Sequence, residues 1–228
     1  MADKLSAPKP AQATPDMTSA TKDMSLAAII LAAGSSRRFG TGNKLLADID
    51  GMPLIRHVAL RVLASRAGRV LVVTGHQNDK VEQALAGLDV ICVHNTRHLD
   101  GMSTTVAAGI KALPAEVQAA MITPGDLPEI SPQLIDRLIA IATASGGERI
   151  VFPTLPTGEQ RNPVLWPKHY FAELAALSGD TGARGLIKKH QAQALPVPMT
   201  TPEAFADIDR PEDLEAWRKK RGRSAKPE

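Results

Sequence analysis

Short apolar runs alternate along the chain with longer mixed segments. The run Leu26–Ala33 is uninterrupted and ends at Gly34, a pattern typical of a strand buried on both faces of a parallel sheet. Three later runs predict further strands, at Arg69–Val73, Leu88–Val93 and Ala119–Thr123. The segments between and after them predict helices, at Pro53–Ser65, His76–Ala86, Ser103–Leu113 and Ser131–Ala144.

Two of these helices have recognisable starts. Ser131-Pro132 combines a capping serine with proline at the first helical position, and Ser103 is a candidate N-cap. Repetition of strand and helix predicts an α/β fold with a mostly parallel central sheet and helices on both faces.

The second half of the chain is less regular. We expect two more strands, two helical segments, two short extended pieces and a closing helix, at Glu148–Pro153, Arg161–Trp166, Lys168–Ala176, Gly179–Lys189, Pro196–Pro198, Ala204–Ile208 and Pro211–Lys220. No domain boundary interrupts this order. The sequence therefore predicts one domain over residues 25–217, a disordered extension over residues 1–24 and a basic disordered tail over residues 218–228.

Composition narrows the function classes. The formal charge of +3 over 228 residues is misleading, because residues 218–228 hold six basic residues and one acidic residue. The remainder holds 21 basic and 23 acidic residues, which argues against a nucleic-acid binder. The single cysteine, Cys92, lies in an apolar run and is expected to be a buried thiol. A lone cysteine, no secretory signal and no run near the ~20 apolar residues of a membrane span favour a cytoplasmic protein.

The loop after the first strand carries the groups that a polyphosphate needs. Gly34, Gly40 and Gly42 let the backbone approach a ligand, and Arg37, Arg38 and Lys44 add positive charge. In open α/β sheets, ligands bind at the carboxyl ends of strands, where this loop lies. The spacing fits neither a Walker A loop nor a dinucleotide fingerprint.

Carboxylates follow later strands. Asp126 comes at the predicted end of the fourth strand, near the same sheet edge as Gly34. Since Mg²⁺ prefers one or two carboxylates together with phosphate oxygens, Asp126 is the first candidate ligand. Asp207 is the second, with Asp209 in support, although Asp209 could instead cap the closing helix. The six histidines show no zinc spacing, and no serine-hydrolase motif is present.

The order Leu-Ala-Ala-Gly-x-Ser-x-Arg-x-Gly, from Leu31 to Gly40 and followed by Lys44, resembles the superfamily that couples nucleoside triphosphates to sugar phosphates, alcohol phosphates and molybdopterin. Five further segments appear in family order, at Val72–His76, Asn95–Gly109, Thr123–Pro128, Arg161–Trp166 and Gly179–Arg184. With them, residues from about Leu26 to Arg218 resemble the molybdenum cofactor cytidylyltransferases, a MobA-like group.

This resemblance implies a Rossmann-like nucleotidyltransferase fold, Mg²⁺ as cofactor, and transfer of a nucleoside monophosphate with loss of pyrophosphate. It implies catalytic roles for Arg38, Lys44 and Asp126, and metal binding by Asp126 and Asp207. Residues implied at the nucleotide are Leu31, Ala32, Ala33, Gly34, Ser36, Gly75, Gly101, Ser103, Thr104 and Thr105. Those implied at the acceptor are Arg161, Asn162, Gly179, Asp180 and Arg184. Arg161-Asn-Pro163 departs from the Gly-His-Pro of many relatives, which implies acceptor contacts that differ from theirs.

The expected substrates follow from the same resemblance. Guanylyl relatives tend to carry a second glycine where this chain has Ala33, and a methyl group there leaves less room for a purine. CTP is therefore the expected nucleotide and molybdopterin, or molybdenum cofactor, the acceptor. Transient contact with a molybdenum hydroxylase apoenzyme is a further expected interaction.

Three alternatives stay open at this point. The enzyme could transfer a guanylyl group, or use a sugar or polyol phosphate as acceptor. The protein could also be a chaperone that binds molybdenum cofactor without catalysis. A nucleic-acid binder acting through its basic tail is the third class, and it predicts strongly salt-dependent binding.

Overall fold

The computed structural model describes residues 25–40, 42–199 and 205–224, with side chains described up to residue 220. The predicted extension over residues 1–24 lies outside the described residues. In the described part, a seven-stranded sheet has the order β5-β4-β1-β6-β8-β7-β9. Its strands are β1 (Leu26–Ala32), β4 (Arg69–Thr74), β5 (Ile91–His94), β6 (Ala119–Pro124), β7 (Ile150–Thr154), β8 (Val164–Pro167) and β9 (Ala194–Pro198).

The sheet is mostly parallel, as the sequence predicts. Strand β1 pairs in parallel with β4 and β6, β4 with β5, and β7 with β9. Strand β8 alone among these runs antiparallel, to both β6 and β7. A two-stranded hairpin that the apolar pattern did not predict, β2 (Asp48–Ile49) with β3 (Met52–Pro53), leads into the first helix.

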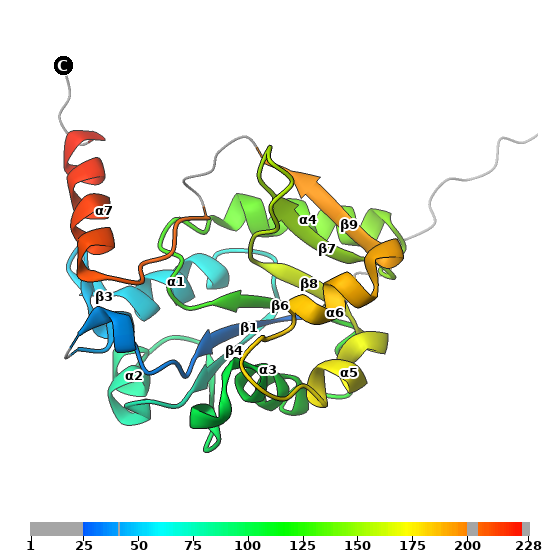
Figure 1. Cartoon of the computed structure of the whole chain (residues 1–228), viewed down its shortest axis with the longest axis horizontal. Coiled ribbons are helices and arrows are strands. Elements are labelled where there is room, and N and C mark those ends of the chain that lie inside the picture. Colours follow the sequence, from blue (N-terminus) through cyan, green and yellow to red (C-terminus); the bar gives the residue numbers. More distant parts are fainter. Residues whose placement is uncertain (1–24, 41, 200–204, 225–228) are drawn as a thin grey trace, which may run out of the picture.

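Helices cover both faces of the sheet (Figure 1). Ala28 and Ile30 of β1 pack toward the core that contains the apolar residues of α1 and α4. The intervening Ile29 belongs to the second core, with residues of α3, α5 and α6. This alternation is expected for a central strand with helices on either side. The helices are α1 (Leu54–Leu63), α2 (Asn78–Ala84), α3 (Met102–Lys111), α4 (Pro132–Ala144), α5 (Phe171–Ala175), α6 (Arg184–Lys189) and α7 (Pro211–Ser224), with 3-10 turns η1 (Arg37–Phe39), η2 (Lys44–Leu46), η3 (His98–Asp100), η4 (Lys168–Tyr170) and η5 (Gln191–Gln193).

The predicted start of α4 is confirmed: the Ser131 hydroxyl accepts a hydrogen bond from the Leu134 amide, with Pro132 at the first helical position. The predicted start of α3 is wrong. Gly101 occupies the N-cap position, and Ser103 lies inside the first turn, where its side chain is fully buried.

Two other expectations are wrong. Cys92 is exposed, because β5 is the edge strand of the sheet and its residues are covered less than those of β4. Helix α7 continues to Ser224, so residues 218–224, which the charge pattern assigned to a disordered tail, are helical. None of the helices in the described ranges is long and apolar enough to cross a membrane.

Candidate active site

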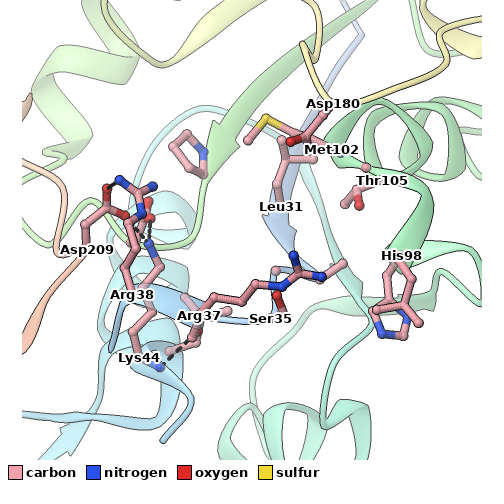
Figure 2. A pocket seen from close by; sticks show the side chains of 18 of the residues that line it. Leu31, Ser35, Arg37, Arg38, Lys44, His98, Met102, Thr105, Asp180 and Asp209 are labelled. Atoms are coloured by element: carbon pink, nitrogen blue, oxygen red, sulfur yellow. Dashed lines mark hydrogen bonds and ion pairs between the residues drawn. The ribbon is translucent and has the colours of Figure 1, made fainter. Parts of the chain in front are cut away.

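A cavity of about 670 Å³ lies at the carboxyl ends of β1 and β6 (Figure 2). This edge is where an open parallel sheet binds its ligands, because the loops that follow neighbouring strands meet there. Its lining comes from the loop after β1, the turn η3 with the start of α3, the residues after β6, the segment before α6, and the segment before α7. Elements far apart in the sequence therefore share one cavity.

The loop after β1 is held open by its own polar side chains. Ser36 adopts a left-handed conformation with φ of 52°, and its hydroxyl accepts a hydrogen bond from the Lys44 amide at 3.2 Å. Asn43 is buried and caps η2 by accepting a hydrogen bond from the Leu45 amide at 3.0 Å. The Asn43 side-chain amide also donates to the carbonyl of His76, after β4, at 3.4 Å. These bonds fix the position from which Lys44 enters the cavity.

Lys44 lies between two carboxylates. Its ammonium contacts Asp126 Oδ2 at 2.5 Å and Asp209 Oδ1 at 2.7 Å. Asp209 also pairs with Arg38 at 2.9 Å. The Lys44 side chain is 15% exposed and that of Arg38 is 69% exposed, so Lys44 lies within the wall of the cavity while Arg38 approaches from solvent.

Burial and these contacts shift the pKa values of Lys44, Asp126 and Asp209. Burial alone would lower the pKa of Lys44, but the Asp126 and Asp209 carboxylates outweigh it, and the pKa is raised. Burial raises the pKa of Asp126, and only part of this is offset by Lys44. Burial also acts to raise the pKa of Asp209, but the bonds from Lys44 together with the charge of Arg38 lower it. Lys44 is therefore cationic at neutral pH.

The residues around Asp126 fit a divalent cation. Asp126 Oδ1 is buried and has no hydrogen-bond partner among the described residues, which is a lone pair left free for a ligand. The preceding Gly125 allows the chain to come close, because a Cβ there would lie 2.8 Å from the Ile55 side chain. No group of three or more His, Cys, Asp or Glu converges within the described ranges, so oxygen atoms of a ligand would have to complete the coordination.

The opposite wall is formed by η3 and the start of α3. A Cβ on Gly75 would lie 2.7 Å from the Ala33 Cβ and 2.6 Å from that of His98, so Gly75 lets these side chains meet. The buried Asn95 amide donates to the hydroxyls of Thr104 and Thr105, at 3.0 and 3.1 Å. Thr105 lines the cavity, whereas Thr104 holds the turn together from within.

The structure brings together many of the residues that the sequence singled out. Those lining the cavity are Leu31, Ala33, Gly34, Ser36, Arg38, Lys44, Gly101, Thr105, Asp126, Gly179 and Asp180. Ala32, Gly75, Ser103 and Thr104 lie outside its lining, and Asp207 is exposed and also outside it, although its charge acts on Asp126.

Three residues expected at the acceptor lie outside the lining of this cavity. Arg161 pairs with Glu159, with Nη2 and Oε2 2.8 Å apart, and Asn162 precedes the cis-proline Pro163. Neither lines the cavity described above. Arg184 lines a second cavity beside α6. The segment before α6 runs from Asp180 in the first cavity to Arg184 in the second.

Two further residues line the cavity. Arg37, one of the three cations that the sequence assigned to a polyphosphate, extends across the middle of the cavity in Figure 2, and His98, which was not predicted to have a role, faces it from the other side. Asn43, which organises the loop, was also missed, although an Asn directly before Lys44 is a recognisable cap signal for a short helical turn. Asp209 was named only as a supporting residue, because its place next to Pro211 also suits a helix start.

Comparison with known proteins agrees with this geometry. The model of a family described as MobA-like NTP transferase domain matches residues 28–194. Among curated proteins, the bifunctional protein GlmU of Kineococcus radiotolerans is 29% identical over 174 residues, which is 74% of this chain and 33% of that protein. The chain thus spans about a third of the length of the curated relatives it matches.

Solved structures share the fold. A nucleotidyl transferase from Methanothermobacter thermautotroptrophicus has a TM-score of 0.75 at 22% identity, over 87% of this chain and 98% of that one. Rv0371C of Mycobacterium tuberculosis in complex with manganese gives 0.66 at 20% identity, over 85% and 97%. CMP:2-keto-3-deoxy-manno-octonic acid synthetase complexed with CTP gives 0.69 at 16% identity, over 87% and 99%.

Proposed function

The chain belongs to the family of MobA-like NTP transferase domains, and from this premise we propose that it is a metal-dependent cytidylyltransferase. Its proposed reaction transfers CMP from CTP to molybdopterin, or to molybdenum cofactor, and releases pyrophosphate. The observation that carries the proposal is the meeting of Lys44, Asp126 and Asp209 in one cavity at the carboxyl ends of β1 and β6. A cation and two carboxylates at one point suit a polyphosphate and its metal ion.

The choice of cytidine has two supports. Ala33 lines the cavity, where its methyl group takes up space that a purine would need. Solved structures with the same fold include the synthetase complexed with CTP and 4-diphosphocytidyl-2C-methyl-D-erythritol synthase from Anaerococcus prevotii. At 16% and 14% identity, these two proteins share the fold of this chain.

For the metal, we assign Asp126 and Asp209 as the protein ligands, in preference to Asp207. Asp126 has a buried oxygen with no partner among the described residues, and Asp209 lines the cavity and shares Lys44 with it. The side chain of Asp207 is exposed and does not line the cavity. Mg²⁺ or Mn²⁺ suits such a set, since each binds carboxylate and phosphate oxygens. When bound, the ion neutralises charge on the reacting phosphates.

The residues of the chain then have distinct tasks. An oxygen of the acceptor phosphate attacks the α-phosphorus in line, and the bond to the pyrophosphate breaks. Because the attacking phosphate is already ionised at neutral pH, no general base is required. Lys44 and Arg38, now held by Asp209, would turn to the triphosphate and stabilise the charge that grows on the α-phosphate and leaving pyrophosphate. Arg37 is close enough to the same space to add a third positive charge.

Pyrophosphate release is the decisive measurement. The protein is incubated with Mg²⁺, molybdopterin and each of the four common triphosphates, and CTP is expected to give the highest rate. Lys44→Ala and Asp126→Ala should each lower turnover by roughly 10²–10³-fold. Lys111→Ala, which alters an exposed lysine at the end of α3, is the matched control. Unchanged turnover in both cavity variants would mean that the assignment is wrong.

A second candidate shares the nucleotide half of this reaction. The match to GlmU and the fold shared with the octonic acid synthetase favour testing sugar and polyol phosphates as acceptors beside molybdopterin. Pyrophosphate release with a sugar phosphate alone would select this candidate. Binding of molybdopterin with no pyrophosphate release from any triphosphate would instead favour the chaperone.

A further inference from the structure

The second cavity lies between α6, the end of β7 and the start of β9, and has a volume of about 470 Å³. Part of its lining is apolar, with Phe152 and Ile187 both buried. The exposed cationic residues Arg184 and Lys188 also line it. An apolar lining together with cations suits a small organic anion.

Neither Arg184 nor Lys188 is neutralised by a described residue. Arg184 and Lys188 are four residues apart on one helix, so they lie on the same face. Within the described ranges, neither has a hydrogen-bond or ion-pair partner, and no residue lining the cavity is acidic. The neighbouring acid, Glu159, is paired with Arg161 and lies outside the lining. By contrast, Lys44 and Arg38 in the first cavity are both held by carboxylates.

Neutral hydrogen-bonding side chains complete the lining. Gln160 lies on the turn between β7 and β8, and Gln191 follows α6. Both side chains offer an N–H donor and a carbonyl acceptor, which can orient a polar ring or chain. Together with the unpaired cations they make a site with more specificity than a charged surface alone.

The second cavity is next to the first. Gly179 and Asp180 line the first cavity, and Arg184 lines the second. Four residues of chain span at most about 14 Å even when fully extended. The segment is also held against α3, because the Ser103 amide donates to Gly179 O at 3.1 Å and the Met102 amide to Asp180 Oδ1 at 3.2 Å. One elongated ligand can therefore reach into both cavities.

We infer that the second cavity binds a second anionic group of the acceptor, other than the phosphate that reacts. This inference rests on the proposed function and adds Lys188, Gln160 and Gln191 to its acceptor site. The acceptor is then a phosphate monoester with a second negatively charged group, whose reacting phosphate lies in the first cavity. An acceptor with no second anion would leave Arg184 and Lys188 unused.

Acceptor binding without nucleotide tests the inference. Molybdopterin is the probe, and its dissociation constant is measured by ultrafiltration for the wild type, Arg184→Gln, Lys188→Gln and the double variant. Loss of one charge-assisted bond should weaken binding about tenfold in each single variant, and about a hundredfold in the double variant. The dissociation constant of CTP, measured on the same proteins, should stay within about twofold of the wild-type value, which is below the loss of a single bond.

Lys189→Gln is the matched control. Lys189 is the next residue on the same helix, but its ammonium pairs with Glu173 at 2.6 Å and does not line the cavity. All variants alter exposed side chains, and their melting temperatures should match the wild type. The inference is overturned if the double variant binds molybdopterin as the wild type does, or if Lys189→Gln weakens binding equally.

A failure of the proposed function would look different. If wild-type protein releases pyrophosphate with another acceptor and not with molybdopterin, the same variants are tested by the KM for that acceptor, which should rise about tenfold while the KM for CTP is unchanged. If the wild type releases no pyrophosphate with any of the acceptors tested, the proposed function is wrong and this inference is wrong too.

Discussion

Lys44 has exchangeable partners at its end of the cavity. Two carboxylates and one ammonium lie together there, and Arg38 adds a second positive charge. A triphosphate brings more negative charge than Asp209 alone, so it can draw both cations away from that residue. Asp209 would then be free to face a metal ion. Asp209 thus pairs with Lys44 and Arg38 when no ligand is bound, and would contact the metal ion when the triphosphate binds.

This exchange predicts a difference between two neighbouring aspartates. Asp209→Asn should weaken binding of Mn²⁺ in the presence of CTP by at least about tenfold, because a charged ligand is lost. Asp207→Asn should change it by less than about threefold, since Asp207 contributes charge from an exposed position. Electron paramagnetic resonance of free Mn²⁺ gives the dissociation constant of the metal ion for each variant. The reverse order of effects would restore Asp207 as the metal ligand.

Cys92 permits an independent test at the edge of the sheet. Its exposure predicts that iodoacetamide modifies it in the folded protein, whereas a buried thiol would resist. Partial desolvation, together with the charge of Glu82, raises the pKa of this thiol. Because the thiolate is the reactive form, the rate should reach its half-maximum at a higher pH than for free cysteine. Glu82→Gln should move this midpoint downward, and a midpoint below that of free cysteine would contradict the prediction.

At the scale of elements, the start of α3 depends on a close backbone approach. Gly101 has φ of 105°, and a Cβ there would lie 2.4 Å from Gly179 O. Gly101→Ala should therefore lower the free energy of unfolding by about 2 kcal/mol or more, through backbone strain and the displaced segment. Gly185→Ala is the matched control, because a Cβ at Gly185 would meet no atom within 4 Å and α6 gains helix propensity of up to about 1 kcal/mol. Urea denaturation measures the free energy of unfolding of both variants, which should be lowered in Gly101→Ala and unchanged or raised in Gly185→Ala.

The elements that sequence alone predicts well are those with strong local signals. The apolar run of β1 and the Ser131-Pro132 start of α4 require no knowledge of distant residues, and both are found in the structure. The β2–β3 hairpin was missed because its strands have only two residues each, too short for a period. Ser103 was misplaced because the groups that satisfy the start of α3 come from residues 179 and 180, which no local pattern reveals.

The residues of the site divide in the same way, into those with a local sequence signal and those whose place depends on distant residues. The motif order places Lys44 and Asp126 after β1 and β6, and their contact in space follows once those two strands pair side by side. The choice between Asp207 and Asp209 could not be made from sequence, because both lie on one short segment whose course depends on a hydrogen bond from the Ile208 amide to Asp126 O. Sequence could not show that Arg184, expected at the acceptor, lines a cavity other than the one that contains Lys44 and Asp126.

At the scale of the whole molecule, the last helix is tied to the first cavity. Asp213 in α7 accepts hydrogen bonds from the backbone amides of Asp209 and Arg210, at 3.0 and 2.8 Å. One turn further, Trp217 is buried, stacks edge-on with His57 of α1 and donates to Glu129 at 2.7 Å. Figure 1 shows α7 at the end of the molecule beside β3, remote from β9 and α6. Docking of α7 therefore holds Asp209 where Lys44 can reach it.

This linkage predicts a coupled loss. Trp217→Ala should cost about 3 kcal/mol of unfolding free energy by removing a buried aromatic side chain, and it should also weaken binding of Mn²⁺ with CTP, although Trp217 does not line the cavity. Trp217→Phe keeps most of the apolar contact and loses the bond to Glu129, so it should recover most of the affinity. The dissociation constants of Mn²⁺ for both variants are measured well below the melting temperature of the less stable variant, where each protein is folded. If Trp217→Ala is destabilised but binds the metal like the wild type, then α7 contributes stability alone, and Asp209 is positioned by the chain on its other side, through Ile208 and Asp126.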